Sequence, residues 1–154
     1  MQTSAAPRAK GHAVKISAPN QLKGTVSSVA EGAVNGIVTI DLGGAAVKAS
    51  IAMEAIDDLG IKEGVDAYAI IKATSVMFAA GSERIAGISA RNQLAGTVES
   101  VKKGAVNGHV SLKLADGGTI KGSITNDAID ELGLTEGAAA LVIVKSTDVI
   151  VGVE

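Results

Sequence analysis

Groups that can donate hydrogen bonds to an anion occur at two places in each half of the sequence. Near the start of the first half lies Ser17, in SAPN, and near the start of the second half lie Ser89 and Arg91, in SARN. Lys72-Ala73-Thr74 and Lys145-Ser146-Thr147 stand late. Hydroxyl, guanidinium, ammonium and backbone N–H groups are the donors that a tetrahedral dianion requires. Ser and Asn before a strand also commonly form turns, so these residues alone leave both interpretations open.

The sequence offers no comparable set for catalysis. Nucleophilic catalysis requires a hydroxyl or thiol beside a base, but the only histidines are His12 and His109, and there is no cysteine. His109 matches Ile37 in the first half, so we interpret it as a surface residue. The adjacent acids Asp57-Asp58 and Asp130-Glu131 would diverge around a helix, which favours a solvated face. We predict no enzyme, no organic cofactor and no cationic metal site, since phosphate-loop and dinucleotide motifs are also lacking.

The candidate groups recur because the sequence contains an internal repeat. ISAPNQLKGTV begins at Ile16 and ISARNQLAGTV at Ile88, 72 residues later, and GAVNG at Gly32 matches GAVNG at Gly104. The second copy gains one residue in the turn at residues 115–118. We therefore predict a flexible extension (residues 1–15), a first domain (16–80), a linker (81–87) and a second domain (88–154).

Each repeat predicts the same order of strands, from mixtures of β-branched and small residues and from alternation of apolar with polar ones. The expected strands are residues 22–29, 37–42, 47–51, 65–72 and 76–79 in the first repeat, and 94–101, 110–114, 119–124, 138–145 and 149–153 in the second. Five short strands in so small a unit are typical of an OB-like barrel.

One short helix is expected in each repeat, before the last two strands. Residues 53–59 and 126–132 place apolar side chains on one face. Thr125 or Asn126 is expected to cap the second helix, and Gly60 and Gly133 follow the two helices as C′ residues. The predicted fold is mainly β: two tandem OB-like five-stranded β-barrel domains, each with one short α-helix.

Composition excludes several other classes of function. The formal net charge is −2 and the chain has one Tyr, one Phe and no Trp, whereas OB folds that bind single strands use stacked aromatics and a basic groove. No apolar run reaches the roughly 18 residues of a membrane span, and residues 1–15 lack the apolar stretch of a secretory signal. We expect a cytoplasmic protein that binds neither nucleic acid nor membrane. A regulatory module that senses an oxyanion and acts on a protein partner stays open as an alternative.

The sequence resembles a known family along both repeats. SARNQLAGTVESVKKGAVNGHVSL, residues 89–112, followed by IKGSIT, AIDELGL and VIVKSTDVIVGV, resembles the Mop domain of the molbindins, which is related to the TOBE domain. The resemblance implies that six such units assemble, so that a tandem chain forms a homotrimer. It also implies that molybdate or tungstate is bound at unit interfaces, for intracellular storage or buffering of the oxyanion.

The resemblance further implies which residues bind. One site type would use a Ser-Arg segment and a Lys segment drawn from neighbouring units: Ser89, Ala90, Arg91, Lys145 and Ser146, with Ser17, Ala18, Lys72 and Ala73 at the matching positions of the first repeat. Pro19 replaces the arginine there, which removes a charged fork and a backbone donor. The weaker candidates, for a second site near the threefold axes, are Gly32, Ala33, Val34, Asn35, Gly104, Ala105, Val106 and Asn107.

Overall fold

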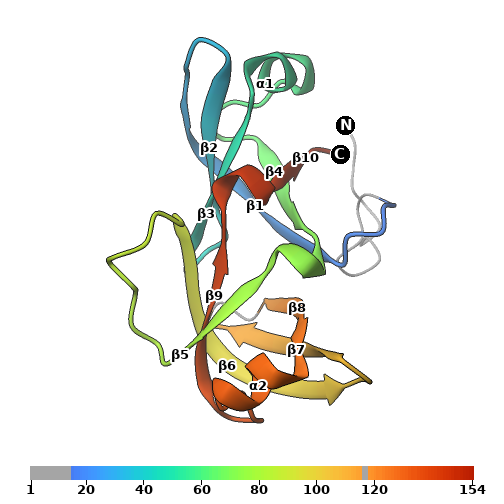
Figure 1. The fold of residues 1–154 in the computed structure, drawn as a ribbon. Helices are drawn as coiled ribbons and strands as arrows, with labels where there is room; N and C mark the ends of the chain where they lie inside the picture. The colour runs from blue at the N-terminus through green and yellow to red at the C-terminus, as the bar shows by residue number, and fades with distance from the viewer. Residues whose placement is uncertain (1–14, 116–117) are drawn as a thin grey trace.

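A computed structural model describes residues 15–115 and 118–154 (Figure 1). The predicted extension therefore lies outside the described residues except for Lys15, as do the two central residues of the turn at 115–118. The first repeat contains β1 (Asn20–Ala30), β2 (Asn35–Asp41), β3 (Ala46–Ala52), α1 (Met53–Leu59), β4 (Asp66–Ile71), the 3-10 turn η1 (Ala73–Ser75) and β5 (Met77–Ala80). The second contains β6 (Asn92–Lys103), β7 (Asn107–Leu114), β8 (Thr119–Thr125), α2 (Asn126–Glu131), β9 (Ala139–Val144), η2 (Ser146–Asp148) and β10 (Ile150–Gly152).

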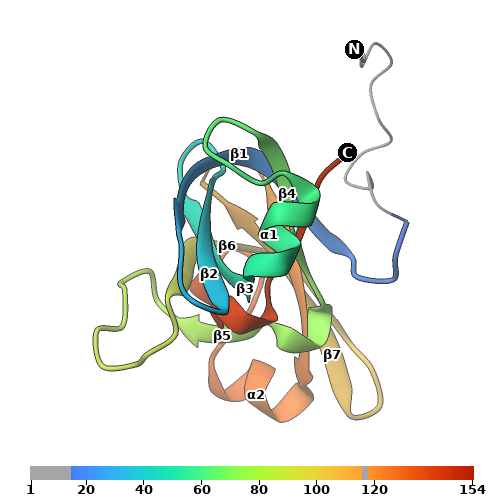
Figure 2. The same ribbon diagram turned by 90° about the horizontal axis from the view of Figure 1, so that it is seen from above.

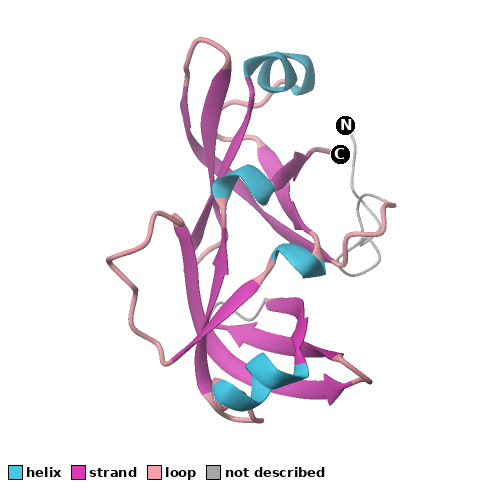
Figure 3. Cartoon of the chain, viewed as in Figure 1, coloured by secondary structure: helices cyan, strands magenta, loops and turns pink. Residues whose placement is uncertain are grey.

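The strands form two curled, five-stranded antiparallel sheets, which exchange their last strands between the repeats (Figures 1 and 3). The strand orders are β10-β4-β1-β2-β3 and β5-β9-β6-β7-β8. β10 of the second repeat pairs with β4, placing Val151 opposite Ala69, and β5 of the first repeat pairs with β9, placing Phe78 opposite Val142. The predicted fold class is confirmed, with one short α-helix beside each sheet. The exchange means that neither repeat completes its sheet without the other.

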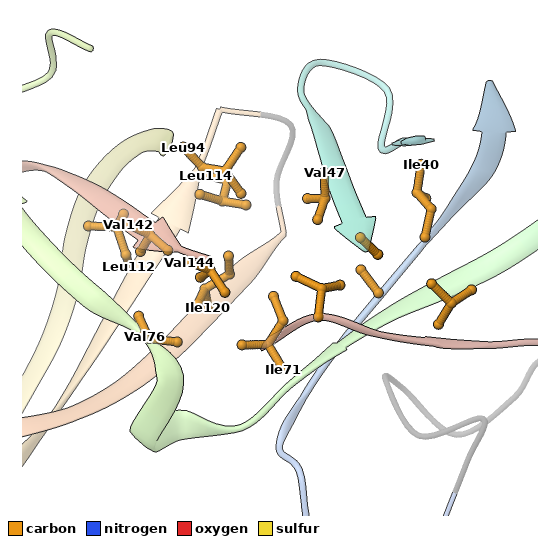
Figure 4. Packing of buried hydrophobic residues seen from close by; sticks show 14 of the residues in the cluster. Ile40, Val47, Ile71, Val76, Leu94, Leu112, Leu114, Ile120, Val142 and Val144 are labelled. Carbon is orange, nitrogen blue, oxygen red and sulfur yellow. The ribbon is translucent and has the colours of Figure 1, made fainter. Parts of the chain in front are cut away.

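One hydrophobic core runs through both repeats. Inward-facing side chains such as Val38, Ile40 and Val47 are fully buried, and they belong to the same cluster as Leu112 and Ile120. Figure 4 shows members of this cluster from both repeats, among them Ile40 and Val47 of the first and Leu112 and Ile120 of the second. A continuous apolar cluster of this kind is a main source of stability for two units that are individually small.

The helices are short and follow the predicted end signals. The Thr125 side chain accepts a hydrogen bond from the Ala128 N–H at 3.1 Å, which confirms it as the N-cap of α2. Gly60 and Gly133 adopt left-handed backbone conformations, with φ of 67° and 65°, as expected after a helix end. No helix in the described parts of the chain is long and apolar enough to span a membrane.

Candidate anion-binding site

The early and late donor segments of a repeat lie side by side at one end of its central strands. Asn92 pairs with Val144, so Arg91 immediately before β6 and Lys145 immediately after β9 extend from adjacent strands. The corresponding strands β1 and β4 of the first repeat have the same register. Within this chain each such pair of segments belongs to a single repeat, and the expectation that a site draws its two segments from neighbouring units stays a prediction for an assembled protein.

A buried asparagine at the start of each repeat binds the backbone of the other repeat. The Asn92 side chain is 3% exposed; its Oδ1 accepts from the Lys48 N–H at 2.7 Å and its Nδ2 donates to the Lys48 carbonyl at 2.8 Å. Asn20 holds the backbone of Lys121 in the same way, with both hydrogen bonds at 2.8 Å. Each asparagine thus fastens the start of one repeat to the third strand of the other. We call the Asn92–Lys48 contact the first junction and the Asn20–Lys121 contact the second junction.

A cavity of about 310 Å³ lies at the first junction. Arg91 and Ser146 of the second repeat line it together with Lys48 and Thr39 of the first. The Lys48 ammonium donates to the Thr39 hydroxyl at 3.3 Å. The remaining lining residues are Ser28, Ala30 and Ile37.

The chemistry of this lining suits an anion. Two cationic side chains and three hydroxyl groups face the cavity, and none of the lining residues carries a carboxylate. Arginine supplies a planar fork that can bond two oxygens of one oxyanion, while lysine acts as a point charge. The arrangement can therefore hold a small, multiply charged oxyanion by charge and directed hydrogen bonds.

Contacts with the linker hold the start of the second repeat in place. Gln93 pairs with both backbone groups of Ile85, accepting at 2.7 Å and donating at 2.9 Å. Arg84 donates to the carbonyl of Arg91 at 3.3 Å. The linker thus lies back against the segment that carries Arg91 instead of only spanning the two repeats.

The other predicted donors are distributed around the junctions. Ser89 and Lys145 are exposed and Ala90 is half-buried, close to Arg91 and Ser146 in the chain but not among the residues that line the cavity. Ser17 and Lys72 are exposed near the second junction, and Ala73 is half-buried in η1. Ala18 is 5% exposed and packs with Tyr68 and Ile70, so its side chain serves packing.

The weaker candidates occupy the turns of the β1–β2 and β6–β7 hairpins. The Gly104 N–H donates to the Asn107 carbonyl at 2.8 Å, and the carbonyls of Val34 and Val106 accept from the first residues of α1 and α2. Val34 is 74% and Val106 70% exposed. The two turns point away from each other in Figures 1 and 2, so a single chain does not combine them into one site. Residues 32–35 and 104–107 therefore stay a prediction for an assembled protein.

Sequence reasoning missed the residues that one repeat supplies to the other's site. Lys48, Thr39 and the two asparagines carry ordinary strand patterns, and only the contact between repeats gives them a role. The one available signal was the recurrence of Asn at the same strand start in both repeats. Within the described residues, no group of three or more His, Cys, Asp or Glu is placed to hold a metal ion.

Comparison with known proteins gives consistent matches over both repeats. A family model described as the TOBE domain matches residues 16–78 and 88–151. The molybdenum transport protein ModE of Herbaspirillum seropedicae is 37% identical over 142 residues, which are 92% of this chain and 52% of that protein. A probable molybdenum-pterin-binding protein of Haemophilus influenzae is 55% identical over 65 residues, 42% of this chain and 94% of that protein.

A solved structure matches the whole arrangement. The cytoplasmic molybdate-binding protein ModG, in a form with molybdate bound, superposes with a TM-score of 0.86 and 42% sequence identity. The match covers 92% of this chain and 100% of that one. The chain spans about half the length of the curated relatives, such as ModE, that it matches over most of its own length.

Proposed function

Because the chain belongs to the TOBE-domain family, we propose that it binds molybdate or tungstate and does not act as an enzyme. The observation that carries this proposal is the carboxylate-free cavity at the first junction, where Arg91 and Ser146 meet Lys48 and Thr39. The names of its relatives support it, since ModG is called a molybdate-binding protein and others are called molybdenum-pterin-binding proteins. The description of ModG as cytoplasmic supports the same compartment for this chain.

The electrostatics of the cavity explain how a chain with net charge −2 can attract a dianion. Long-range attraction is absent, so the local charges of Arg91 and Lys48 must supply the binding energy. Arginine remains charged at every working pH and orients its bonds in one plane, which favours a fixed oxyanion geometry. Ser146 and Thr39 can complete the shell as neutral donors.

The volume and the exposed surface favour an assembly. A cavity of about 310 Å³ corresponds to roughly ten waters at about 30 Å³ each, more than one tetrahedral oxyanion fills. Val34 and Val106 are mostly exposed at the hairpin tips, and Met77 and Ile150 on the exchanged strands are 44% and 47% exposed. Burial of such residues between chains is favourable. We therefore propose a homotrimer of six units in which neighbouring chains narrow the sites, with storage or buffering of the oxyanion as its role.

Calorimetry on the purified chain tests the binding. We expect molybdate and tungstate to bind and sulfate to bind far more weakly. Arg91→Ala should lower the affinity of the first-junction site by about 1.5–3 kcal/mol, roughly 10- to 150-fold, the range for a hydrogen bond to a charged group. Pro19→Ala is the matched control, because the proline at the corresponding position has neither charge nor N–H to lose.

Four results would contradict the proposal or a part of it. Equal heats with sulfate and molybdate would indicate a general salt effect. Parent-like affinity in a folded Arg91→Ala variant would show that the cavity is not the binding site. A monomer by native mass spectrometry at micromolar concentration would refute the trimer, and co-purification of a bound partner whose activity responds to molybdate would favour the sensing role over storage.

A further inference from the structure

The second junction repeats the geometry of the first with different side chains. Asn20 fastens Lys121 as Asn92 fastens Lys48, and η1 packs against β8 as η2 packs against β3. The strand registers also correspond between the two sheets. The residues that line the first cavity therefore have these counterparts at the second junction: Ser100 for Ser28, Lys102 for Ala30, His109 for Ile37, Ser111 for Thr39, Lys121 for Lys48, Pro19 for Arg91 and Ala73 for Ser146.

Compared with the first junction, the second junction lacks some hydrogen-bond donors and has others in their place. The second junction loses the arginine fork and one serine hydroxyl, because Pro19 and Ala73 stand in their places. It gains two nitrogen donors on the opposite wall, where Lys102 and His109 replace an alanine and an isoleucine. Together with Lys121, these make three nitrogen-bearing side chains, against Arg91 and Lys48 at the first junction.

These groups are neighbours on one face of the second sheet. Lys102 pairs directly with His109 across β6 and β7, and Ser100 pairs with Ser111 two residues along each strand. Ser111 in turn pairs with Lys121 on β8. Side chains directly opposite in an antiparallel pair have Cβ atoms about 4.5–5.5 Å apart, so a single small ligand can reach all of them.

Within the described residues, no carboxylate pairs across the strands with Lys102, His109, Ser111 or Lys121, and the acid nearest to them on β6 is Glu99, at the bulge next to Ser100. β8 places Ser123 opposite His109, β7 continues to Lys113 beyond Ser111, and η1 adds only residues without ionisable side chains. In the described part of the chain, the ion pair seen beside this region joins Lys103 to Asp130, and none involves Lys102, His109 or Lys121. A bound dianion would offset the positive charges of Lys102 and Lys121, neither of which has an ion-pair partner among the described residues.

We propose that the second junction is a distinct oxyanion site, in which Lys102, His109 and Lys121 replace the arginine fork as ligands of a tetrahedral dianion. This inference rests on the proposed function, since it assigns the same class of ligand to a second place. An ammonium group binds as a point charge and fixes the orientation of an oxyanion less than a guanidinium does, and the His109 ring adds an N–H donor.

Molybdate calorimetry at fixed pH and salt separates the two sites in the full chain. Arg91→Ala should retain one class of molybdate sites, those of the second junction. Lys102→Ala combined with His109→Ile copies the first-repeat residues, which a folded strand pair already accommodates. This variant should lose the class of sites that Arg91→Ala retains, with at least a tenfold loss of affinity, and keep the class that depends on Arg91. Lys103→Ala, the adjacent lysine in the Asp130 ion pair, is the control and should change neither class.

The outcomes distinguish this inference from the proposed function. Absence of molybdate binding by the parent chain would refute both. Loss of all molybdate binding in Arg91→Ala would support the first site and contradict the second. Unchanged stoichiometry and affinity in the folded Lys102→Ala/His109→Ile variant would overturn the assignment of these ligands.

Discussion

Gly122 and Phe78 form a matched pair that packs an exchanged strand against the second sheet. A Cβ built on Gly122 lies 2.5 Å from Cε2 and 2.8 Å from Cζ of Phe78, and 2.9 Å from Cγ1 of Val76. Phe78 is only 8% exposed, so its ring has little room to withdraw. We expect Gly122→Ala to destabilise the protein by about 1–3 kcal/mol, the usual cost of overpacking a core.

The first repeat contains the compensating pair. Ala49 stands at the position of Gly122, and Val151 on the other exchanged strand stands at the position of Phe78. Phe78→Val alone removes four buried carbons and should cost about 3 kcal/mol at about 0.8 kcal/mol each. The double variant reproduces the first-repeat pair, so the new methyl occupies space that the ring vacated. The double variant should therefore lose about 1–3 kcal/mol less stability than the two single variants lose in sum, which is the interaction energy found between residues in contact.

Urea unfolding followed by circular dichroism, at one fixed protein concentration, measures these differences. Gly87→Ala serves as the control, because a Cβ there meets nothing within 4 Å and the substitution should be nearly neutral. A Gly122→Ala variant as stable as the parent would show that β5 does not pack on β8 in this way. Strict additivity in the double variant would show that the two residues do not contact.

Two further substitutions test the first junction and the helix cap. Asn92→Ala should lower the free energy of unfolding in urea by about 2–4 kcal/mol, because the N–H and carbonyl of Lys48 would lose their partners at about 1–3 kcal/mol each. The same variant should bind molybdate more weakly in calorimetry. Unchanged affinity would show that the Asn92–Lys48 contact does not support the binding site. Thr125→Ala removes the side-chain acceptor of the Ala128 N–H and should lower the free energy of unfolding by about 1 kcal/mol. Thr125→Ser keeps the hydroxyl and should retain most of the parent's stability, which tests whether the hydroxyl is responsible.

The local structure was predictable because its causes lie close together in the sequence. Alternation of apolar with polar residues predicted the strands, and Thr125, Gly60 and Gly133 predicted where the helices begin and end. The exchange of β5 and β10 was not predictable in this way. Each repeat offers an equivalent strand edge, β4 or β9, and the pattern of residues 76–79 fits either of them. The choice depends on packing between distant residues, such as that of Phe78 against Gly122.

The candidate site was predictable only on the side where its chemistry is concentrated in sequence. Arg91 and Ser146 belong to polar segments at strand ends, where an arginine or a hydroxyl suggests binding. Lys48 and Thr39 sit inside strands whose alternation already accounts for a polar residue facing outward. Nothing near them in the sequence indicates that Asn92 of the other repeat fastens Lys48 beside Arg91. This half of the site is a property of the fold, not of a motif.

The exchanged architecture lets the two junctions diverge independently. Each junction joins the strand ends of one repeat to the third strand of the other, so a substitution in either repeat changes one junction and leaves the second unaltered. Pro19 removes a donor at the second junction without touching Arg91 at the first, and His109 adds one there without touching Ile37. A homodimer or homo-oligomer of single repeats cannot do this, because every change would appear at all equivalent junctions. Fusion of two repeats in one chain is therefore the feature that would let one protein hold the two proposed oxyanion sites with different ligands and affinities.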